Sequence, residues 1–199
     1  MKSAAPTLDH WRAYQMAVER VEQLLIDVTG ALSGVGAPYA VIGGKAVAAW
    51  VSTIDPDSVR NTKDVDLLVE RGKVDQLDAG VRSIGMYLDY VGDIACLLHQ
   101  ENPSPKRGVH LLYAGEKVRP SDPHPTPTMA EVVQSARGFP IVTLPALLRM
   151  KLIAFRKHDQ VHVEDMLRVG LITPEVRAQI PADLLPRLEQ IEAEAPDRL

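Results

Sequence analysis

Two aspartates, and a pair of glycines upstream of them, have the residue types and spacing for phosphate chemistry. Asp64 and Asp66 are separated by one apolar residue in the run Asp-Val-Asp-Leu-Leu-Val. On a strand, residues two apart point to the same face, so both carboxylates would project from one surface of a sheet. Such carboxylates repel each other unless a cation lies between them. Mg²⁺ suits this position because it prefers a few carboxylates together with the phosphate oxygens of a substrate.

The glycine pair Gly43-Gly44 supplies the second half of the pattern. It follows the apolar run 38–42 and precedes a helical stretch over 46–51. A turn of this kind offers free backbone N–H groups and the positive end of a helix dipole, which both suit phosphate. Each half alone is also typical of a tight connection or of solvated acids at a strand end. The combination is more specific and predicts a site for a metal-bound nucleoside triphosphate.

The elements that would position these residues mix strands and helices. Helices are expected over 7–32, 46–51, 73–83, 144–157 and 161–169, and strands over 38–42, 64–69, 93–98, 108–113 and 139–142. Four prolines within residues 120–127 exclude regular structure there. The fold class is therefore α/β (α+β), with strands in the first part of the chain and helices after them. We expect a core with an N-terminal helix over residues 1–142 and a helical subdomain over 143–199.

The first expected helix carries apolar residues at alternating spacings of three and four. These are Trp11, Tyr14, Val18, Val21, Leu25, Val28 and Leu32. This spacing is that of an amphipathic helix with one apolar face.

The chain resembles the nucleotidyltransferase fold of the DNA polymerase β superfamily in the runs Val-Ile-Gly-Gly-Lys-Ala-Val and Arg-Asn-Thr-Lys-Asp-Val-Asp-Leu-Leu-Val. More narrowly, it resembles the AbiEii/AbiGii-type nucleotidyltransferase-like toxins of abortive-infection and toxin–antitoxin systems. The later run over 144–159 resembles the second motif of that family, a helix that carries Lys, then Arg, then Asp. The resemblance implies that Asp64 and Asp66 are catalytic and bind the metal. It also implies a mixed sheet flanked by helices, and that Gly43 and Gly44 hold the triphosphate.

Further nucleotide-binding residues are implied by the same resemblance. Lys151 would neutralise the phosphates, Arg156 follows it in the second motif, and Asp159 would help to fix the helical lobe. Lys45 and Thr62 lie beside the first motif and are added to the nucleotide-binding set. An exposed lysine at the end of an element is the alternative interpretation of Lys45.

The implied activity is transfer of a nucleoside monophosphate from an NTP to an acceptor hydroxyl, on RNA or protein, with Mg²⁺ or Mn²⁺. A toxin-like role would bring an antitoxin protein as partner. Two alternatives stay open: a catalytically impaired module that binds NTP or RNA, and a non-enzymatic adaptor whose C-terminal helices recognise another protein.

His110 is the main departure from the family pattern. The family usually supplies a third carboxylate from the next central strand, and the matching position here is His110. Histidine can act as a base or a metal ligand, although imidazole suits Zn²⁺ or Mn²⁺ better than Mg²⁺. His110 is therefore either an altered catalytic residue or a sign of lost catalysis. His162 stands where the family often has an acid, and with His158 it could bind zinc if both lie on one helix face.

Composition limits the remaining classes. Hydrophobic residues make up 46% of the 199 residues and charged residues 24%, which excludes a disordered or fibrous chain. The formal net charge of −4 argues against a general nucleic-acid coat protein. Cys96 is the single cysteine, so no intrachain disulfide can form. The N-terminus has no apolar signal region and no run is long enough to span a membrane, so we expect a cytoplasmic protein without a membrane partner.

Overall fold

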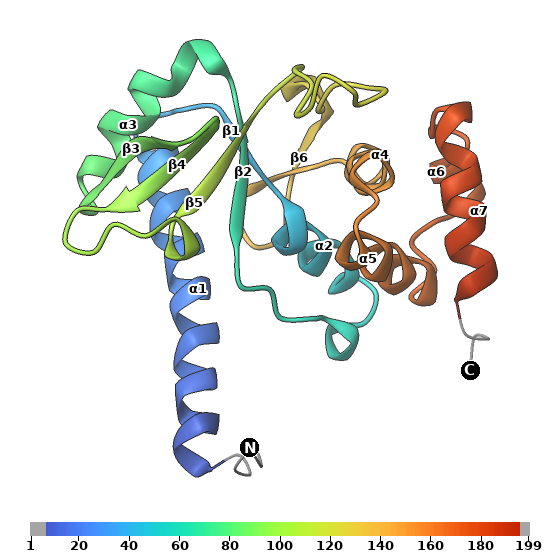
Figure 1. The fold of residues 1–199 in the computed structure, drawn as a ribbon, viewed down its shortest axis with the longest axis horizontal. Helices are drawn as coiled ribbons and strands as arrows, with labels where there is room; N and C mark the ends of the chain where they lie inside the picture. The colour runs from blue at the N-terminus through green and yellow to red at the C-terminus, as the bar shows by residue number, and fades with distance from the viewer. Residues whose placement is uncertain (1–6, 196–199) are drawn as a thin grey trace.

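Seven strands form one mixed sheet in the order β3-β4-β5-β2-β1-β7-β6 (Figure 1). The computed structural model describes residues 7–195 of the chain. The strands are β1 (Tyr39–Ile42), β2 (Val65–Val69), β3 (Met86–Val91), β4 (Ile94–His99), β5 (Val109–Tyr113), β6 (Val132–Gln134) and β7 (Pro140–Val142). In the centre, β2 pairs antiparallel with β1 and parallel with β5, and β1 pairs parallel with β7.

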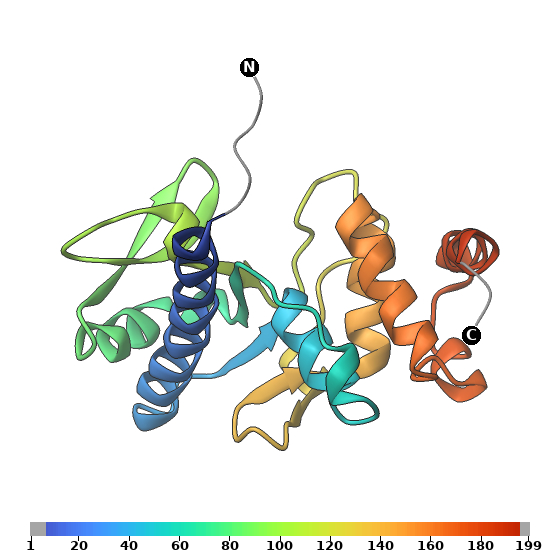
Figure 2. The same cartoon turned by 90° about the horizontal axis from the view of Figure 1, so that it is seen from below.

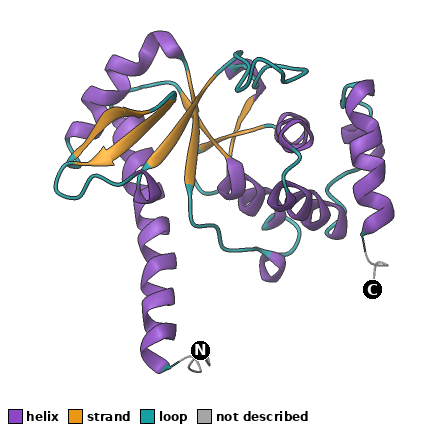
Figure 3. Cartoon of the chain, viewed as in Figure 1, coloured by secondary structure: helices purple, strands orange, loops and turns teal. Residues whose placement is uncertain are grey.

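The helices cover both faces of this sheet (Figure 3). They are α1 (Leu8–Gly34), α2 (Gly43–Val51), α3 (Val74–Arg82), α4 (Leu144–Ala154), α5 (Lys157–Arg168), α6 (Pro174–Arg177) and α7 (Leu185–Glu194). Along β1, Tyr39 and Val41 join a core with α1 and α3, whereas Ala40 and Ile42 join a second core with α2, α4 and α5. This alternation follows from the two-residue period of a strand that is buried on both faces.

Helix α1 is only partly packed against the sheet. Leu25, Val28 and Leu32 in its C-terminal half are completely buried, whereas every side chain from residue 7 to residue 17 is exposed. Figure 1 shows this N-terminal half, in dark blue, extending away from the sheet, and Figure 2 shows the same end from below, in front of the strands. The face that packs on the sheet therefore continues along a segment that has no cover within residues 7–195.

The fold class expected from the sequence is confirmed, with local corrections. Strands β3 and β6, which lie at the two edges of the sheet, were not predicted. Helix α2 begins at Gly43 rather than Ala46, and α5 begins at Lys157 rather than Val161. The predicted helix over 144–157 ends at Ala154, because Phe155 takes a left-handed conformation with φ of 48°.

The division of the chain at residue 142 stays a prediction, although α2 shares one core with α4 and α5 across that boundary. Within residues 7–195, no helix is both long enough and apolar enough to cross a membrane.

Candidate active site

The Gly43 turn and Asp66 are built into direct contact. Gly43 has a positive φ of 65°, which favours glycine, and it is the first residue of α2. A Cβ atom at this position would overlap Oδ2 of Asp66 and would lie 3.0 Å from its Cγ. The register between β1 and β2 sets Ile42 opposite Asp66, so the strand pairing itself brings the carboxylate to the turn. The structure therefore joins the two motifs that the sequence analysis singled out.

Gly44 is the meeting point of three segments. A Cβ atom there would overlap the side chain of Thr62, which comes from the loop before β2. It would also lie 3.4 Å from Cε1 of His162, which comes from α5. Thr62 is thus placed beside the glycine turn, and its role in nucleotide binding stays a prediction. The close approach of Thr62 explains why position 44 has no room for a side chain.

His110 lies beside Asp66 on the neighbouring strand. The parallel register of β2 and β5 pairs these two residues, and Nδ1 of His110 lies 3.3 Å from Oδ1 of Asp66. The hydrogen bond to Asp66 raises the pKa of His110 above its usual value, although burial acts in the opposite direction. Both side chains keep about a third of their surface exposed, 30% for His110 and 29% for Asp66. The pair is therefore accessible to a ligand.

Asp64 precedes β2 and has an exposed side chain. Its negative charge contributes to the raised pKa of His110, which places its carboxylate within electrostatic reach of the same group. Asp64, Asp66 and His110 thus gather at one end of the central strands. All three were predicted from the sequence.

These residues fit a divalent cation that is shared with a substrate. Within the described residues, no three His, Cys, Asp or Glu side chains form a group that could hold a metal ion by themselves. The protein would therefore offer two carboxylates, from Asp64 and Asp66, and the other ligands would be water and phosphate oxygens. Mg²⁺ is commonly bound in this way. The same observation leaves His158 and His162 without a third ligand for zinc among residues 7–195, and their ring centroids lie 6.2 Å apart.

Lys45 does not offer a free ammonium group. Its Nζ donates a hydrogen bond to Oε2 of Glu22 on α1 at 2.8 Å, and only 8% of its side chain is exposed. Glu22 also pairs with Arg137, which comes from the loop between β6 and β7. Lys45 therefore ties α2 to α1, a contact that the sequence analysis missed because the two residues are far apart in the chain.

Lys151 and Asp159 form a buried ion pair between α4 and α5. Nζ of Lys151 donates to Oδ1 of Asp159 at 2.9 Å, and the two side chains are 7% and 1% exposed. Nε of Arg156 donates to Oδ2 of the same carboxylate at 2.8 Å. Burial would raise the pKa of Asp159, but the hydrogen bond from Arg156 and the charge of Lys151 lower it. Asp159 thus connects the two helices, and Lys151 already has a carboxylate as partner.

A second buried carboxylate, Asp165, ties the site loop to α5. Nε of Arg60 donates to Oδ2 of Asp165 at 2.6 Å, and Asp165 is only 2% exposed as a residue. Arg60 opens the run that leads through Thr62 to Asp64, so this bond holds the loop against the helix. Arg60 belongs to the motif around Asp64, but nothing in the sequence indicates a partner 105 residues away.

His162 is neutral and lies against the glycine turn. Burial, together with the nearby charge of Lys151, lowers its pKa to about 4. Its Nδ1 atom is buried, and within residues 7–195 it has no hydrogen-bond partner. The departure from the family pattern at this position thus places an uncharged ring behind Gly44.

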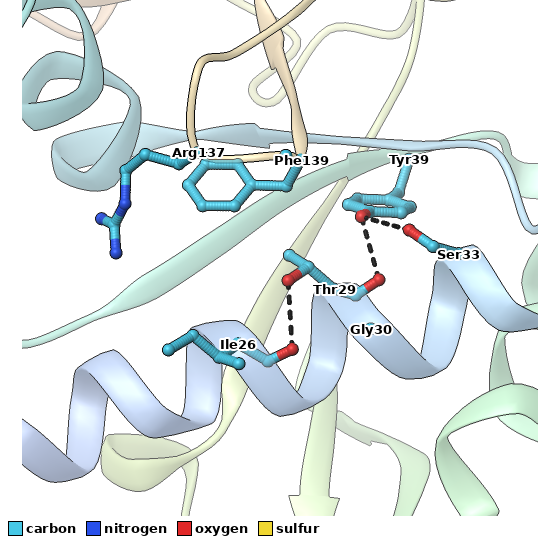
Figure 4. A pocket seen from close by; sticks show the side chains of 8 residues that line it. Ile26, Thr29, Gly30, Ser33, Tyr39, Arg137 and Phe139 are labelled. Atoms are coloured by element: carbon cyan, nitrogen blue, oxygen red, sulfur yellow. Dashed lines mark hydrogen bonds between the residues drawn. The ribbon is translucent and has the colours of Figure 1, made fainter.

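A separate hollow lies between α1 and the β6–β7 loop, away from these residues (Figure 4). Ile26, Thr29, Tyr39, Arg137 and Phe139 are among the residues that line it. The Tyr39 hydroxyl donates to the backbone oxygen of Thr29 at 3.0 Å, so its polar group is already satisfied. None of the predicted site residues lines this hollow.

Comparisons with known proteins bear on the fold. No family model and no curated protein sequence matches the chain. The solution structure of the antibiotic-resistance factor ANT(2'')-Ia is 14% identical, with a TM-score of 0.54 over 86% of this chain and 95% of that chain. An antigenic nucleotidyltransferase-like protein from Paracoccidioides brasiliensis is 16% identical, with a TM-score of 0.47 over 92% and 94% of the two chains. The first likeness supports a nucleotidyltransferase fold for this chain.

Proposed function

We propose that this protein is a metal-dependent nucleotidyltransferase that moves a nucleoside monophosphate from an NTP to an acceptor hydroxyl. The observation that carries the proposal is the contact between the Gly43 turn and Asp66, because a glycine turn at a helix start suits phosphate and here lies against a carboxylate. His110 and Asp64 lie near Asp66 and extend this cluster of polar side chains at one end of the central strands. The nucleotidyltransferase fold adds support at the level of architecture only.

In the proposed reaction, the acceptor oxygen forms a bond to the α-phosphorus. The bond from that phosphorus to the oxygen that bridges to the β-phosphate breaks, and pyrophosphate leaves with both bonding electrons. The hydroxyl proton passes to a base, for which His110 is the candidate because it lies beside Asp66. A bound Mg²⁺ or Mn²⁺ would stabilise the charge of the triphosphate. Asp64 and Asp66 would hold that cation, and the backbone N–H groups of Gly43 and Gly44 would bind phosphate oxygens.

A label-transfer assay tests this proposal. The purified protein is incubated with each α-labelled NTP, with Mg²⁺ or Mn²⁺, and with a mixture of total RNA and cell protein. We expect label on an RNA or protein acceptor, and we expect the Asp64→Asn/Asp66→Asn variant to lose it while it remains folded. Full activity in that double variant would overturn the assigned roles.

The second candidate function is a non-catalytic module that binds NTP or RNA. It is favoured by one observation, which is that β5 presents His110 beside Asp66 in place of a third carboxylate. This module would bind labelled NTP with Mg²⁺ but transfer nothing, and His110→Asp would either restore transfer or leave the module inert. An adaptor protein would bind no nucleotide in the same experiment.

For the biological role we propose a toxin-like component of a phage-defence or toxin–antitoxin system, in the cytoplasm and with an antitoxin partner. What supports it is the resemblance to the AbiEii/AbiGii type in the two sequence motifs. Overexpression should slow growth, and the Asp64→Asn/Asp66→Asn variant should relieve the effect. Normal growth with the unaltered protein would argue for a housekeeping or regulatory role.

A further inference from the structure

Helix α1 carries one continuous apolar face, the α1 seam, formed by Trp11, Tyr14, Val18, Val21, Leu25, Val28 and Leu32. Its C-terminal part packs in the core with α3, where Leu25, Val28 and Leu32 are completely buried. Its N-terminal part is uncovered within residues 7–195, with Trp11 61% and Tyr14 48% exposed. Figure 1 shows this part of the helix reaching beyond the body.

The exposed segment is the N-terminal part of a helix of 27 residues. Most helical stability in proteins comes from burial of an apolar face, and every side chain from residue 7 to residue 17 is exposed within residues 7–195. The rings of Trp11 and Tyr14 contact each other edge to face, with centroids 6.2 Å apart. Two aromatic side chains one helical turn apart form the kind of anchor that protein interfaces use.

The charges of the exposed segment of α1 argue against nucleic acid or a membrane as its binding partner. Within residues 7–20, Asp9 and Glu19 balance Arg12 and Arg20, so the segment has no basic excess. By the heptad spacing of the seam, these four residues lie on positions away from it. The positions that flank the exposed seam carry His10, Gln15 and Ala17, none of which has a fixed charge. Such flanks produce no repulsion when the seam meets an identical seam.

We propose that the exposed part of the α1 seam pairs with the same segment of a second copy of this chain. Pairing must be antiparallel, because from Val21 onward the side of α1 that carries the seam is occupied by its own sheet. A parallel partner helix would run into that sheet, whereas an antiparallel one places the two bodies at opposite ends of the pair. The contact is then isologous and closes with two-fold symmetry.

The area available fits a reversible dimer. Aromatic side chains bury about 150–250 Å² each when covered, so the exposed parts of the four rings would contribute about 400–500 Å². Leu8, which is 69% exposed, and Val18 extend the contact along the helix. With these neighbours, two helices that meet over about 20 Å would bury about 1,000 Å² in total, the lower limit for a specific interface. We therefore expect a dimer that dissociates in the micromolar range.

Sedimentation equilibrium of the full chain between about 1 and 100 µM tests the proposal. We expect the mass to rise from monomer to dimer over this range. Trp11→Glu should raise the dissociation constant at least about tenfold, since it buries a charge in the centre of the contact. Met16→Glu is the matched control, because Met16 is 62% exposed and lies on the opposite side of the helix. It should leave the dissociation constant unchanged.

The other outcomes would overturn the proposal. A chain that stays monomeric up to about 100 µM, or a dimer that Trp11→Glu leaves intact, would show that the seam does not pair with itself. Circular dichroism and the emission of the partly buried Trp50 report separately that each variant is folded. Nucleotide binding should be the same in both variants, so this test is independent of the proposed function.

Cross-linking tests the orientation. Cys96 is 1% exposed, so a single introduced cysteine would supply the reactive thiol. Near the centre of the segment, Gln15→Cys should link to itself through a short bismaleimide. Near its end, Leu8→Cys should not, because the antiparallel arrangement separates the two copies of residue 8. Efficient linking of Leu8→Cys would contradict the antiparallel pair.

Discussion

At the scale of single residues, the contact between Gly43 and Asp66 decides whether the proposed site can form. Gly43→Ala should lower the free energy of unfolding by about 1–3 kcal/mol, because it adds left-handed strain and displaces the carboxylate. It should also abolish NTP binding with Mg²⁺. Both effects can be measured, by chemical denaturation and by isothermal titration calorimetry.

Gly92→Ala is the matched control for this prediction. Gly92 has a similar φ of 62° but no heavy atom within 4 Å of an added Cβ. This variant should lower the free energy of unfolding only through left-handed backbone strain, by about 1 kcal/mol, and should leave nucleotide binding unchanged. Equal loss of binding in the two variants would mean that the contact with Asp66 is not what matters.

The neutral ring of His162 predicts a pH dependence of stability. Its pKa is lowered from 6.5 to about 4 by burial and by Lys151, against the opposing charges of Asp159 and Asp165. Between these pH values the unfolded chain binds more protons at this site than the folded chain. The free energy of unfolding should therefore fall as pH decreases from 6.5 towards 4, on the order of 1–2 kcal/mol after allowance for partial exposure.

Substitution separates this effect from that of other groups. His162→Phe should flatten the stability curve between pH 6.5 and pH 4, as measured by urea denaturation at several pH values. His99→Gln removes an exposed imidazole at the end of β4, which is not among the groups that shift the pKa of His162, and should leave the curve unchanged. Asp159, whose pKa is lowered, loses its contribution at still lower pH, so it does not account for this window. An unchanged slope in His162→Phe would show that another group is responsible.

At the scale of elements, the buried pair of Lys151 and Asp159 holds α4 and α5 at the break between them. Lys151→Met should lower the free energy of unfolding by about 3–5 kcal/mol, because it removes the buried ammonium partner and leaves the carboxylate of Asp159 with only the more exposed Arg156 and His158 beside it. The double variant Lys151→Met/Asp159→Leu should recover a large part of this loss, since no unpaired charge remains. Chemical denaturation of the single and double variants gives the coupling. Additive losses would contradict a specific ion pair.

The elements that could be predicted are those that are marked by residues close together in the sequence. The strand before Gly43 and the strand after Asp64 are short, apolar and bounded by turn residues. This pattern predicts that both strands are buried on both faces. Strands β3 and β6 lie at the sheet edges, and most of their side chains are partly or fully exposed. In β3 the polar Asp89 interrupts the apolar residues, and β6 has only three residues, so neither forms an uninterrupted apolar run of strand length. The break at Phe155 has no glycine or proline to mark it, and only tertiary packing fixes it.

The same distinction between local and distant signals applies to the residues of the candidate site. Gly43, Gly44, Asp64 and Asp66 could be found because the motif combines residue type with short spacing. The neighbouring position of His110 depends on strand order, which the resemblance supplied. The roles of Lys45 in binding Glu22 and of Arg60 in binding Asp165 depend on partners 23 and 105 residues away. A single sequence contains no signal for such pairs.

At the scale of the whole molecule, the body and the projecting half of α1 should be energetically separate. Of the residues that the structure describes, a chain that begins at Val18 loses only positions 7–17, and all of their side chains are exposed. Measured below about 1 µM, where the proposed dimer is dissociated, its free energy of unfolding should match the full chain within about 0.5 kcal/mol. Its affinity for NTP should also be unchanged, because the site residues lie on the sheet and on α2.

A longer truncation is the control for this separation. A chain that begins at Leu25 also loses Glu22, and with it the partner of the buried ammonium group of Lys45. It should be less stable by several kcal/mol, because breaking a largely buried ion pair leaves a charge without compensation at the start of α2. If the two truncations behaved alike, the Glu22–Lys45 bond would not be what joins α1 to the site. If the shorter truncation already lost stability, the exposed half of α1 would have to pack on its own body, and the proposed dimer would lose its seam.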